Sequence, residues 1–216
     1  MKIIFVTTLF LVLSVSLVYS QSLTAEDIIT KSINYHDPGD NWSGFIGKLV
    51  ITEEREAGDR LTRFSINNQI GRFLFERNDV SHGMLMDSCF VISGEADCDR
   101  VATIRNYYLY LWGLPMKLQD AGTNLQSEVQ SIEDWHGRSV YVIEVHYERE
   151  NWSYFIDQNN FALVGYQFMF NYKEGGELIT LDGELEADGI KFPKTRTWYE
   201  LPGETYLAKD MLTAIE

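Results

Sequence analysis

The feature that most constrains this chain is a repeated alternation of apolar and polar residues in short runs separated by turn residues. In the first run, Leu49 and Ile51 alternate with Lys48 and Thr52. Successive side chains of a strand point to opposite faces of a sheet, so a period of two indicates a strand with one face in a core. Such runs recur through most of the chain, which predicts a large, curved antiparallel sheet.

Two short helices are predicted among these strands. Thr24 is a suitable N-cap for a helix that ends before Pro38, and Asp97 or Asp99 can cap a second helix that ends at Gly113. The fold class is therefore α+β, mainly β, in a single domain over residues 21–216. Residues 206–216 fit either a helix or a strand. The other strands are expected at 44–52, 61–66, 69–76, 80–86, 88–93, 126–133, 138–148, 152–157, 161–172, 177–187 and 190–200.

Residues 1–20 are typical of a signal peptide. Lys2 provides the positive start, residues 3–18 are apolar except for Thr and Ser, and Ser20 is the small residue that a signal peptidase requires. Cleavage is expected before Gln21. A membrane anchor is the alternative, but the apolar run is short for a span and no basic cluster follows it. We therefore expect a periplasmic or secreted protein that is soluble, with no stable membrane anchor, after signal-peptide cleavage.

The charge balance limits the partners of the chain. Eighteen Lys and Arg residues against 32 Asp and Glu residues give a net charge of −14. A protein this acidic has no electrostatic attraction for phosphate backbones or for anionic lipid headgroups. Nucleic acid is therefore excluded as a partner.

Cys89 and Cys98 are the only cysteines, and the eight residues between them include Gly94. In an oxidising compartment such a pair is expected to form a structural disulfide. Closing a loop of about ten residues contributes roughly 2.5–3 kcal/mol in the chain-entropy model. Two buried free thiols or a reactive pair are the alternatives. Two cysteines without clustered histidines are too few for a zinc site.

The sequence contains no recognisable catalytic motif. The four histidines, at positions 36, 82, 136 and 146, lack metal-ligand spacing, and neither a Gly-x-Ser-x-Gly elbow nor a phosphate loop occurs. No catalytic residue, metal or cofactor is therefore predicted. A hydrolytic site that folding assembles across strands would leave no such motif, so it stays open as an alternative.

Aromatic residues are concentrated on the second helix and on one predicted hairpin. Residues 106–118 are aromatic or apolar nearly all round, and residues 152–170 are apolar on both faces. Core packing explains this pattern, and so does a concave sheet that holds an apolar ligand beneath a helix. The choice of hairpin face is open by one residue. Lys117 would meet an acidic headgroup at the mouth or extend into solvent. The residues expected to line the cavity are Tyr108, Leu111, Trp112, Leu114 and Met116 on the helical side and Phe155, Tyr166, Phe168 and Phe170 on the hairpin.

Two segments resemble a known family. Residues 107–120, YYLYLWGLPMKLQD, and 193–199, PKTRTWY, are similar to a family of exported bacterial proteins that has no established activity and is assigned to the lipoprotein-carrier (LolA/LolB-like) fold. The hairpin around residues 152–168 is similar to the central hairpin of that superfamily. The resemblance implies an incomplete antiparallel barrel, lidded by two or three short helices, around an apolar cavity. Because the chain has no lipobox cysteine, an anchored LolB-type role is not expected.

Three functions are compatible with these features. The first is a non-catalytic exported protein that carries or senses a lipid, a lipoprotein acyl chain or another apolar ligand. The second is a sensor or adaptor module that binds a lipidated or other envelope protein through the same fold, and the third is the hydrolase considered above. Because one fold serves several functions, the resemblance does not choose among them.

Overall fold

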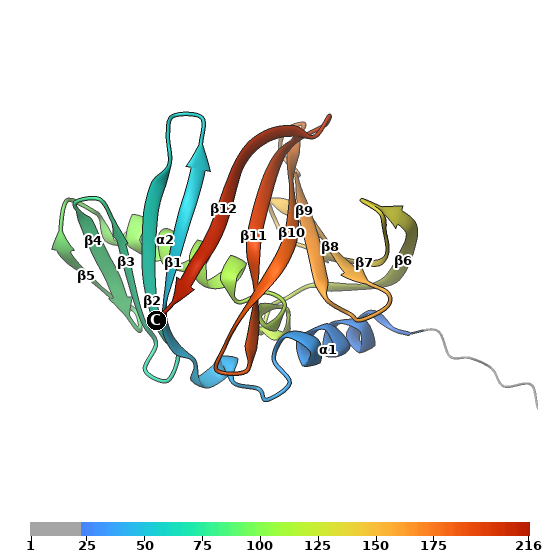
Figure 1. Ribbon diagram of the computed structural model, residues 1–216, viewed down its shortest axis with the longest axis horizontal. Helices are drawn as coiled ribbons and strands as arrows, with labels where there is room; N and C mark the ends of the chain where they lie inside the picture. Colours follow the sequence, from blue (N-terminus) through green and yellow to red (C-terminus); the bar gives the residue numbers. More distant parts are fainter. Residues whose placement is uncertain (1–22) are drawn as a thin grey trace, which may run out of the picture.

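The computed structural model describes residues 23–216, which form one broad, curved sheet with two α-helices (Figure 1). All twelve strands are paired antiparallel in that sheet. The strands are β1 (Ile46–Arg55), β2 (Arg60–Asn67), β3 (Arg72–Arg77), β4 (Val80–Leu85), β5 (Ser88–Ser93), β6 (Leu125–Trp135), β7 (Arg138–His146), β8 (Glu150–Asp157), β9 (Leu163–Phe170), β10 (Gly176–Ala187), β11 (Ile190–Leu201) and β12 (Thr205–Ile215).

The strand order explains why a helix must cross the sheet. The order is β5-β4-β3-β2-β1-β12-β11-β10-β9-β8-β7-β6, so the two edge strands are consecutive in the sequence. The chain between them, α2 (Cys98–Trp112) and the short 3-10 helix η2 (Met116–Gln119), therefore runs from one edge to the other. In Figure 1 it lies behind the sheet, against the concave face.

Local signals in the sequence define both helices. Helix α1 (Ala25–His36) begins with a capping box, in which the Thr24 hydroxyl accepts from the Asp27 amide and the Asp27 carboxylate accepts from the Thr24 amide. Helix α2 begins at Asp97, whose carboxylate accepts from the Arg100 amide at 2.8 Å. Both caps satisfy amides that have no partner within the helix.

The sheet buries apolar side chains on both faces. The main core lies on the concave face, beneath the two helices, and includes Leu49, Phe64 and Tyr154. A smaller cluster on the opposite face contains Val142, Phe155 and four other buried side chains. Because β7 alternates between these clusters, residues 140–143 in its middle are all apolar, as expected for a strand covered on both sides.

The predicted mainly β, curved antiparallel fold is confirmed. The segment at 206–216 is strand β12, which lies between β1 and β11, so Met211 pairs with both Thr52 and Thr195. Sequence periodicity did not distinguish a helix from a strand in this segment, because both faces of the strand are partly covered. The proposed signal peptide at 1–20 lies outside the described residues. A short 3-10 helix, η1 (Trp42–Gly44), precedes β1 and was not predicted.

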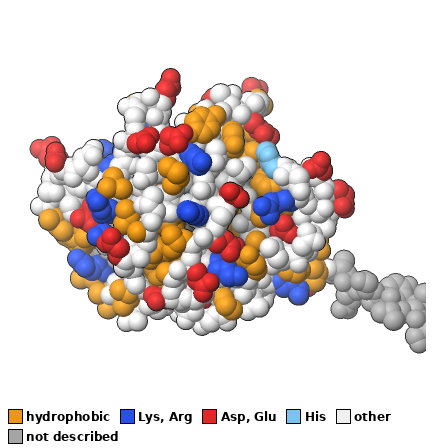
Figure 2. All heavy atoms as spheres, viewed as in Figure 1, with side chains coloured by type: hydrophobic (Ala, Val, Ile, Leu, Met, Phe, Trp, Pro, Cys, Tyr) orange, Lys and Arg blue, Asp and Glu red, His pale blue; other side chains and the backbone are white. Residues whose placement is uncertain are grey.

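The predicted disulfide between Cys89 and Cys98 is present, with the two Cα atoms 5.6 Å apart. It joins edge strand β5 to the first residue of α2. Neither helix of the described chain has the length and apolar character needed to cross a membrane. On the face drawn in Figure 2, apolar, basic and acidic side chains are interspersed over the sheet, and acidic side chains gather at the upper loops and the right-hand edge.

Candidate functional site

An aromatic pocket of about 380 Å³ lies between α2 and strands β8 to β11. Three of its lining residues come from α2, and the others come from the concave face of the sheet. Most of the lining is aromatic, so a guest there would contact rings rather than polar groups. The lining residues are Tyr107, Tyr110, Leu111, Glu150, Trp152, Phe168, Glu177 and Trp198.

Trp152 on β8 is the centre of the ring contacts around this pocket. Its ring centroid lies 4.9 Å from that of Phe168 and 5.8 Å from that of Tyr166, its neighbours on β9. From the helix, Tyr110 meets Trp152 edge to face at 5.5 Å. The Tyr110 hydroxyl also forms hydrogen bonds with those of Tyr147, at 3.0 Å, and Tyr154. The polar end of Tyr110 is thus satisfied, and its ring remains available to an apolar guest.

Glu177 on β10 brings a carboxyl group to the same pocket. It lies directly opposite Phe168 on one neighbouring strand and Glu200 on the other. Burial raises the pKa of Glu177 above its ordinary value of 4.5, and the charges of Glu150 and Glu200 raise it further. The pocket therefore contains a carboxyl group that is more easily neutralised than a surface carboxyl group.

A second pocket, of about 450 Å³, lies beside the first and is lined by five arginines. We call it the arginine pocket. Tyr107 and Leu111 line both pockets, so the two are adjacent beneath α2. The lining residues are Ile51, Glu53, Arg55, Arg60, Arg77, Arg100, Thr103, Ile104, Tyr107, Tyr108, Leu111, Trp112, Arg196 and Asp210.

Cross-strand register gathers these charges. Arg196 on β11 faces Asp210 on β12, Asp210 faces Glu53 on β1, and Glu53 faces Arg60 on β2. Directly opposite residues of antiparallel strands point to the same face, so four charged side chains form one row across the concave face. Two carboxylates lie side by side in that row, and Arg55 reaches both of them, at 2.8 Å from Asp210 and 3.5 Å from Glu53.

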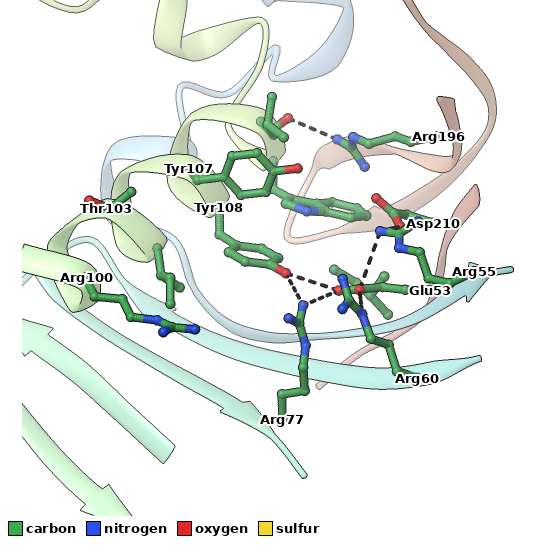
Figure 3. A pocket seen from close by; sticks show the side chains of 14 residues that line it. Glu53, Arg55, Arg60, Arg77, Arg100, Thr103, Tyr107, Tyr108, Arg196 and Asp210 are labelled. Atoms are coloured by element: carbon green, nitrogen blue, oxygen red, sulfur yellow. Dashed lines mark hydrogen bonds and ion pairs between the residues drawn. The ribbon is translucent and has the colours of Figure 1, made fainter. Parts of the chain in front are cut away.

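Glu53 is 2% exposed and accepts hydrogen bonds from several partners. Its carboxylate accepts from Arg60, from the Thr62 hydroxyl at 2.7 Å, from Arg77 at 2.6 Å and from the Tyr108 hydroxyl at 3.1 Å. Burial alone raises the pKa of Glu53, but these hydrogen bonds and the charges of Arg77 and Arg60 outweigh burial and hold the pKa below its ordinary value. Figure 3 shows Arg60, Arg77 and Tyr108 converging on Glu53 from the strands and from α2.

Arg196 differs from the other arginines of the pocket because it is fully buried, with 1% exposure. Its guanidinium lies 3.5 Å from the centroid of the Trp112 ring and donates to the Leu111 carbonyl at 3.0 Å. No ion pair is found for it among residues 23–216, and its Nε has no hydrogen-bond partner there. Burying a charge without a counterion is costly, so a group with this environment is a candidate for ligand contact.

The structure brings most of the predicted site residues together. Tyr108, Leu111 and Trp112 on α2 and Leu114 and Met116 after it are all buried in the main core. Of these, only Tyr108, Leu111 and Trp112 line the arginine pocket, and only Leu111 also lines the aromatic pocket. Leu114 and Met116 are core residues below the pockets.

The hairpin residues divide between the two faces. Tyr166 and Phe168 lie on the concave face, where Trp152 contacts both. Phe155 lies on the opposite face and stacks on Trp135 at 4.3 Å, so it is not brought together with the others. The register predicted for β8 was off by one residue, and Tyr154 faces the main core instead. Phe170 lies at the end of β9, 4.1 Å from the Lys173 ammonium.

Lys117 lies outside both pockets and forms an ion pair with Asp120. Sequence reasoning missed Trp152, Trp198 and the arginines as lining residues. Trp152 could have been found, because a register that places Tyr166 and Phe168 on one face also places Trp152 beside them. Within residues 23–216, no three His, Cys, Asp or Glu side chains come close enough together to hold a metal ion.

Comparison with solved structures identifies the fold. A putative outer membrane lipoprotein-sorting protein domain from Vibrio parahaemolyticus is similar at 10% sequence identity, with a TM-score of 0.53 and coverage of 89% of this chain and 91% of that one. A DUF1329 family protein from Desulfovibrio piger is similar at 9% identity, with a TM-score of 0.54 and the same coverage, 89% and 91%. A LolA superfamily protein from Nitrosomonas europaea matches at 11% identity with a TM-score of 0.48, over 90% of this chain and 94% of that one. The chain shares the fold of the lipoprotein-sorting protein domain and of the DUF1329 family protein.

Sequence comparisons complete this assignment. A search of curated proteins finds no match to the chain. A family model matches residues 2–216, nearly the whole sequence. The chain therefore belongs to DUF6503, a family of unknown function.

Proposed function

We propose that this protein is a non-catalytic, exported binding protein that holds a lipid, an acyl chain or another apolar ligand between its sheet and α2. The observation that carries this proposal is the aromatic pocket. Its volume of about 380 Å³ lies within the range of small-molecule sites, roughly 300–1,000 Å³. A single-domain protein needs no open space beneath a helix for stability, because interiors are normally close-packed. The pocket is therefore better explained by a guest than by the fold alone.

The partners of such a protein follow from the ligand. The ligand of such a carrier would be a lipid or the acyl chain of a lipidated envelope protein, which also fits the name of the lipoprotein-sorting neighbour.

Export through a cleaved signal peptide would place the protein where such ligands occur. N-terminal sequencing of the exported form is expected to begin at Gln21 or within a residue or two of it, and recovery of Met1 in a membrane pellet would favour an anchor.

Co-purified ligand is the most direct test. Organic extraction of the purified protein followed by mass spectrometry is expected to recover a lipid in a constant ratio to protein. The same protein, once delipidated, is expected to bind a neutral, apolar fluorescent probe. Absence of both results would refute the carrier proposal and favour a module that binds proteins.

A pair of neighbouring substitutions locates the ligand. Phe168 lines the aromatic pocket, whereas Met169, the next residue of β9, is 38% exposed on the other face. Phe168→Arg should weaken probe binding by about tenfold or more, because it places a charge in an apolar site. Met169→Arg adds the same charge one residue away and should leave binding unchanged. Circular dichroism must show that both variants are folded, and equal binding by both would place the probe elsewhere.

A further inference from the structure

The arginine pocket concentrates positive charge in an acidic protein. Five of the ten arginines of the chain line this one pocket, although the chain as a whole has a net charge of −14. The same pocket contains only two carboxylates, those of Glu53 and Asp210. The lining therefore has an excess of positive charge, opposite in sign to the rest of the molecule.

Internal ion pairs account for only three of the arginines. Arg55, Arg60 and Arg77 pair with Glu53, and Arg55 also pairs with Asp210. These contacts connect β1, β2, β3 and β12, so a structural role explains them. Within residues 23–216, neither Arg100 nor Arg196 takes part in an ion pair, and both carboxylates are already occupied. In Figure 3, Arg196 lies above this ion-pair cluster, and Arg100 lies to its left, beyond Tyr108.

Arg196 provides a second, independent indication of an anion site. Its Nε and the Tyr166 hydroxyl are both buried polar atoms without a hydrogen-bond partner in the described part of the chain, residues 23–216. The two side chains are close enough to interact electrostatically, but no hydrogen bond of acceptable geometry joins them. Unsatisfied buried polar groups are rare, and a guanidinium that lines the pocket suits an acceptor that carries negative charge.

The position of the arginine pocket relates it to the aromatic pocket. Tyr107 and Leu111 line both, and Trp198 of the aromatic pocket donates to Asp210 of the arginine pocket at 2.8 Å. We propose that the arginine pocket binds the anionic group of an amphiphile, a carboxylate or a phosphate, while the apolar chain of the same molecule lies in the aromatic pocket. This inference rests on the proposed function and names the chemical class of its ligand.

An amphiphile fits these two pockets better than a free small anion. The acidic surface of the chain repels dissolved anions, so a small ion would depend on the arginines alone for its affinity. An acyl chain also buries apolar surface in the adjacent aromatic pocket, which contributes about 25 cal/mol of binding free energy per Å² of buried area. Charge-assisted hydrogen bonds from a guanidinium then select an acidic headgroup over a neutral one.

Ligands that differ only in the headgroup separate the two proposals. The delipidated protein is titrated with lauric acid, dodecyl phosphate, dodecanol and inorganic phosphate. Dodecanol binding alone tests the aromatic pocket and thus the proposed function. We expect laurate or dodecyl phosphate to bind about tenfold to hundredfold more tightly than dodecanol, the effect of one to two charge-assisted hydrogen bonds. Inorganic phosphate is expected to bind more weakly than any of these ligands.

Two substitutions test the arginines. Arg100→Gln changes an exposed side chain, so the variant should fold, and Arg196→Gln removes the buried guanidinium. Both should lower laurate affinity by about fivefold or more and leave dodecanol affinity unchanged. Arg63→Gln, on β2 but outside the pocket, is the matched control and should change neither affinity. If Arg196→Gln does not fold, Arg100→Gln decides the test.

Each outcome has one meaning. Equal affinity for laurate, dodecyl phosphate and dodecanol would overturn the anion site and leave the proposed function standing. Inorganic phosphate that binds as tightly as dodecyl phosphate would show a free-anion site and overturn the joint site. A headgroup preference that survives in the folded Arg100→Gln and Arg196→Gln variants would place the anion elsewhere. Failure of all four ligands to bind would refute the proposed function itself.

Discussion

The two halves of the concave face have the same backbone geometry but opposite chemistry. Strands β1, β2, β3 and β12 present a cluster of arginines and carboxylates, whereas β8, β9 and β10 present aromatic rings. Strand β11 joins the two halves. On its concave face, Arg196 lines the arginine pocket, and Trp198, two residues further on, lines the aromatic pocket. Helix α2 covers both halves, so one helix meets two different surfaces.

The helix is held differently over each half. Over the charged half, the Tyr108 hydroxyl donates to Glu53 at 3.1 Å and accepts from Arg77 at 2.7 Å. Over the aromatic half, Tyr110 meets Trp152 through ring contact at 5.5 Å. Hydrogen bonds to charged groups have a narrow geometry, whereas apolar contacts tolerate replacement of one partner by another. The charged half therefore fixes the helix, and the aromatic half is the part that the apolar chain of a guest can enter.

The largest effect is expected from Glu53→Gln, which would break the charged half. Removal of this buried charge leaves three partly exposed arginines without their shared counterion, so we expect a loss of about 3–4 kcal/mol in the free energy of unfolding. Urea unfolding followed by circular dichroism measures it. Glu54→Gln, at the exposed next position, is the control and should change stability by less than about 0.5 kcal/mol.

Acid should act on the same group. The pKa of Glu53 is depressed in the folded protein, so its contribution to stability is present above the ordinary value of 4.5 and is lost as the pH falls through the depressed pKa. The difference in stability between wild type and Glu53→Gln should therefore shrink below pH 4.5. A difference that does not change with pH would contradict this account.

The second effect concerns the disulfide, which joins α2 to the sheet edge that lies beyond the charged half. It closes a short loop between β5 and the start of α2. Replacing both cysteines by Ala should therefore lower the free energy of unfolding by roughly 2.5 kcal/mol. Hydrogen exchange should then increase at β5 and at the start of α2 more than in β8 and β9. Alkylation of the unfolded, unreduced wild type should label neither Cys89 nor Cys98, and labelling of both would exclude the bond.

Much of this fold was predictable because its signals are local. The caps at Thr24 and Asp97, the alternation along the strands and the Cys89–Cys98 pair each lie within a few residues of sequence. The position of β12 was not predictable, because its two partners lie at opposite ends of the chain. The face that Phe155 occupies was also missed, since β8 is apolar on both sides and alternation cannot choose between them.

The arginine pocket illustrates a different limit. Net charge argued against an electrostatic attraction for phosphate backbones and anionic lipid headgroups. The cross-strand register nevertheless gathers Arg60 and Arg196, which are far apart in the sequence, on one face. A chain-wide sum of charges contains no information about such a local excess. The aromatic half was easier to anticipate, because Phe168 and the aromatic residues of α2 are each part of a dense local run.

A third, smaller effect is expected where the two halves meet. The indole of Trp198 lines the aromatic pocket while its Nε1 donates to Asp210 in the arginine pocket at 2.8 Å. Trp198→Phe keeps a ring but removes this donor to a buried carboxylate. We therefore expect the free energy of unfolding to fall by about 1.5–3 kcal/mol. Tyr199→Phe, one residue along and on the other face, should change stability by less than about 0.5 kcal/mol. Equal losses in both variants would mean that the hydrogen bond contributes nothing.

The smallest expected effect tests whether the aromatic half is as apolar as its rings suggest. Glu177 lies in that pocket with a pKa above 4.5, and a guest that excludes water from it should raise the pKa further. Binding then takes up a proton, so affinity for a neutral probe should rise as the pH falls from neutral through the raised pKa. Glu177→Gln should bind roughly threefold more tightly at neutral pH, because a neutral amide is less costly to desolvate, and should lose the pH dependence. Glu174→Gln makes the same charge change on an exposed turn and should behave as wild type. If Glu177→Gln keeps the pH dependence of the wild type, another group is responsible, and the carboxyl group of Glu177 faces water when the guest is bound.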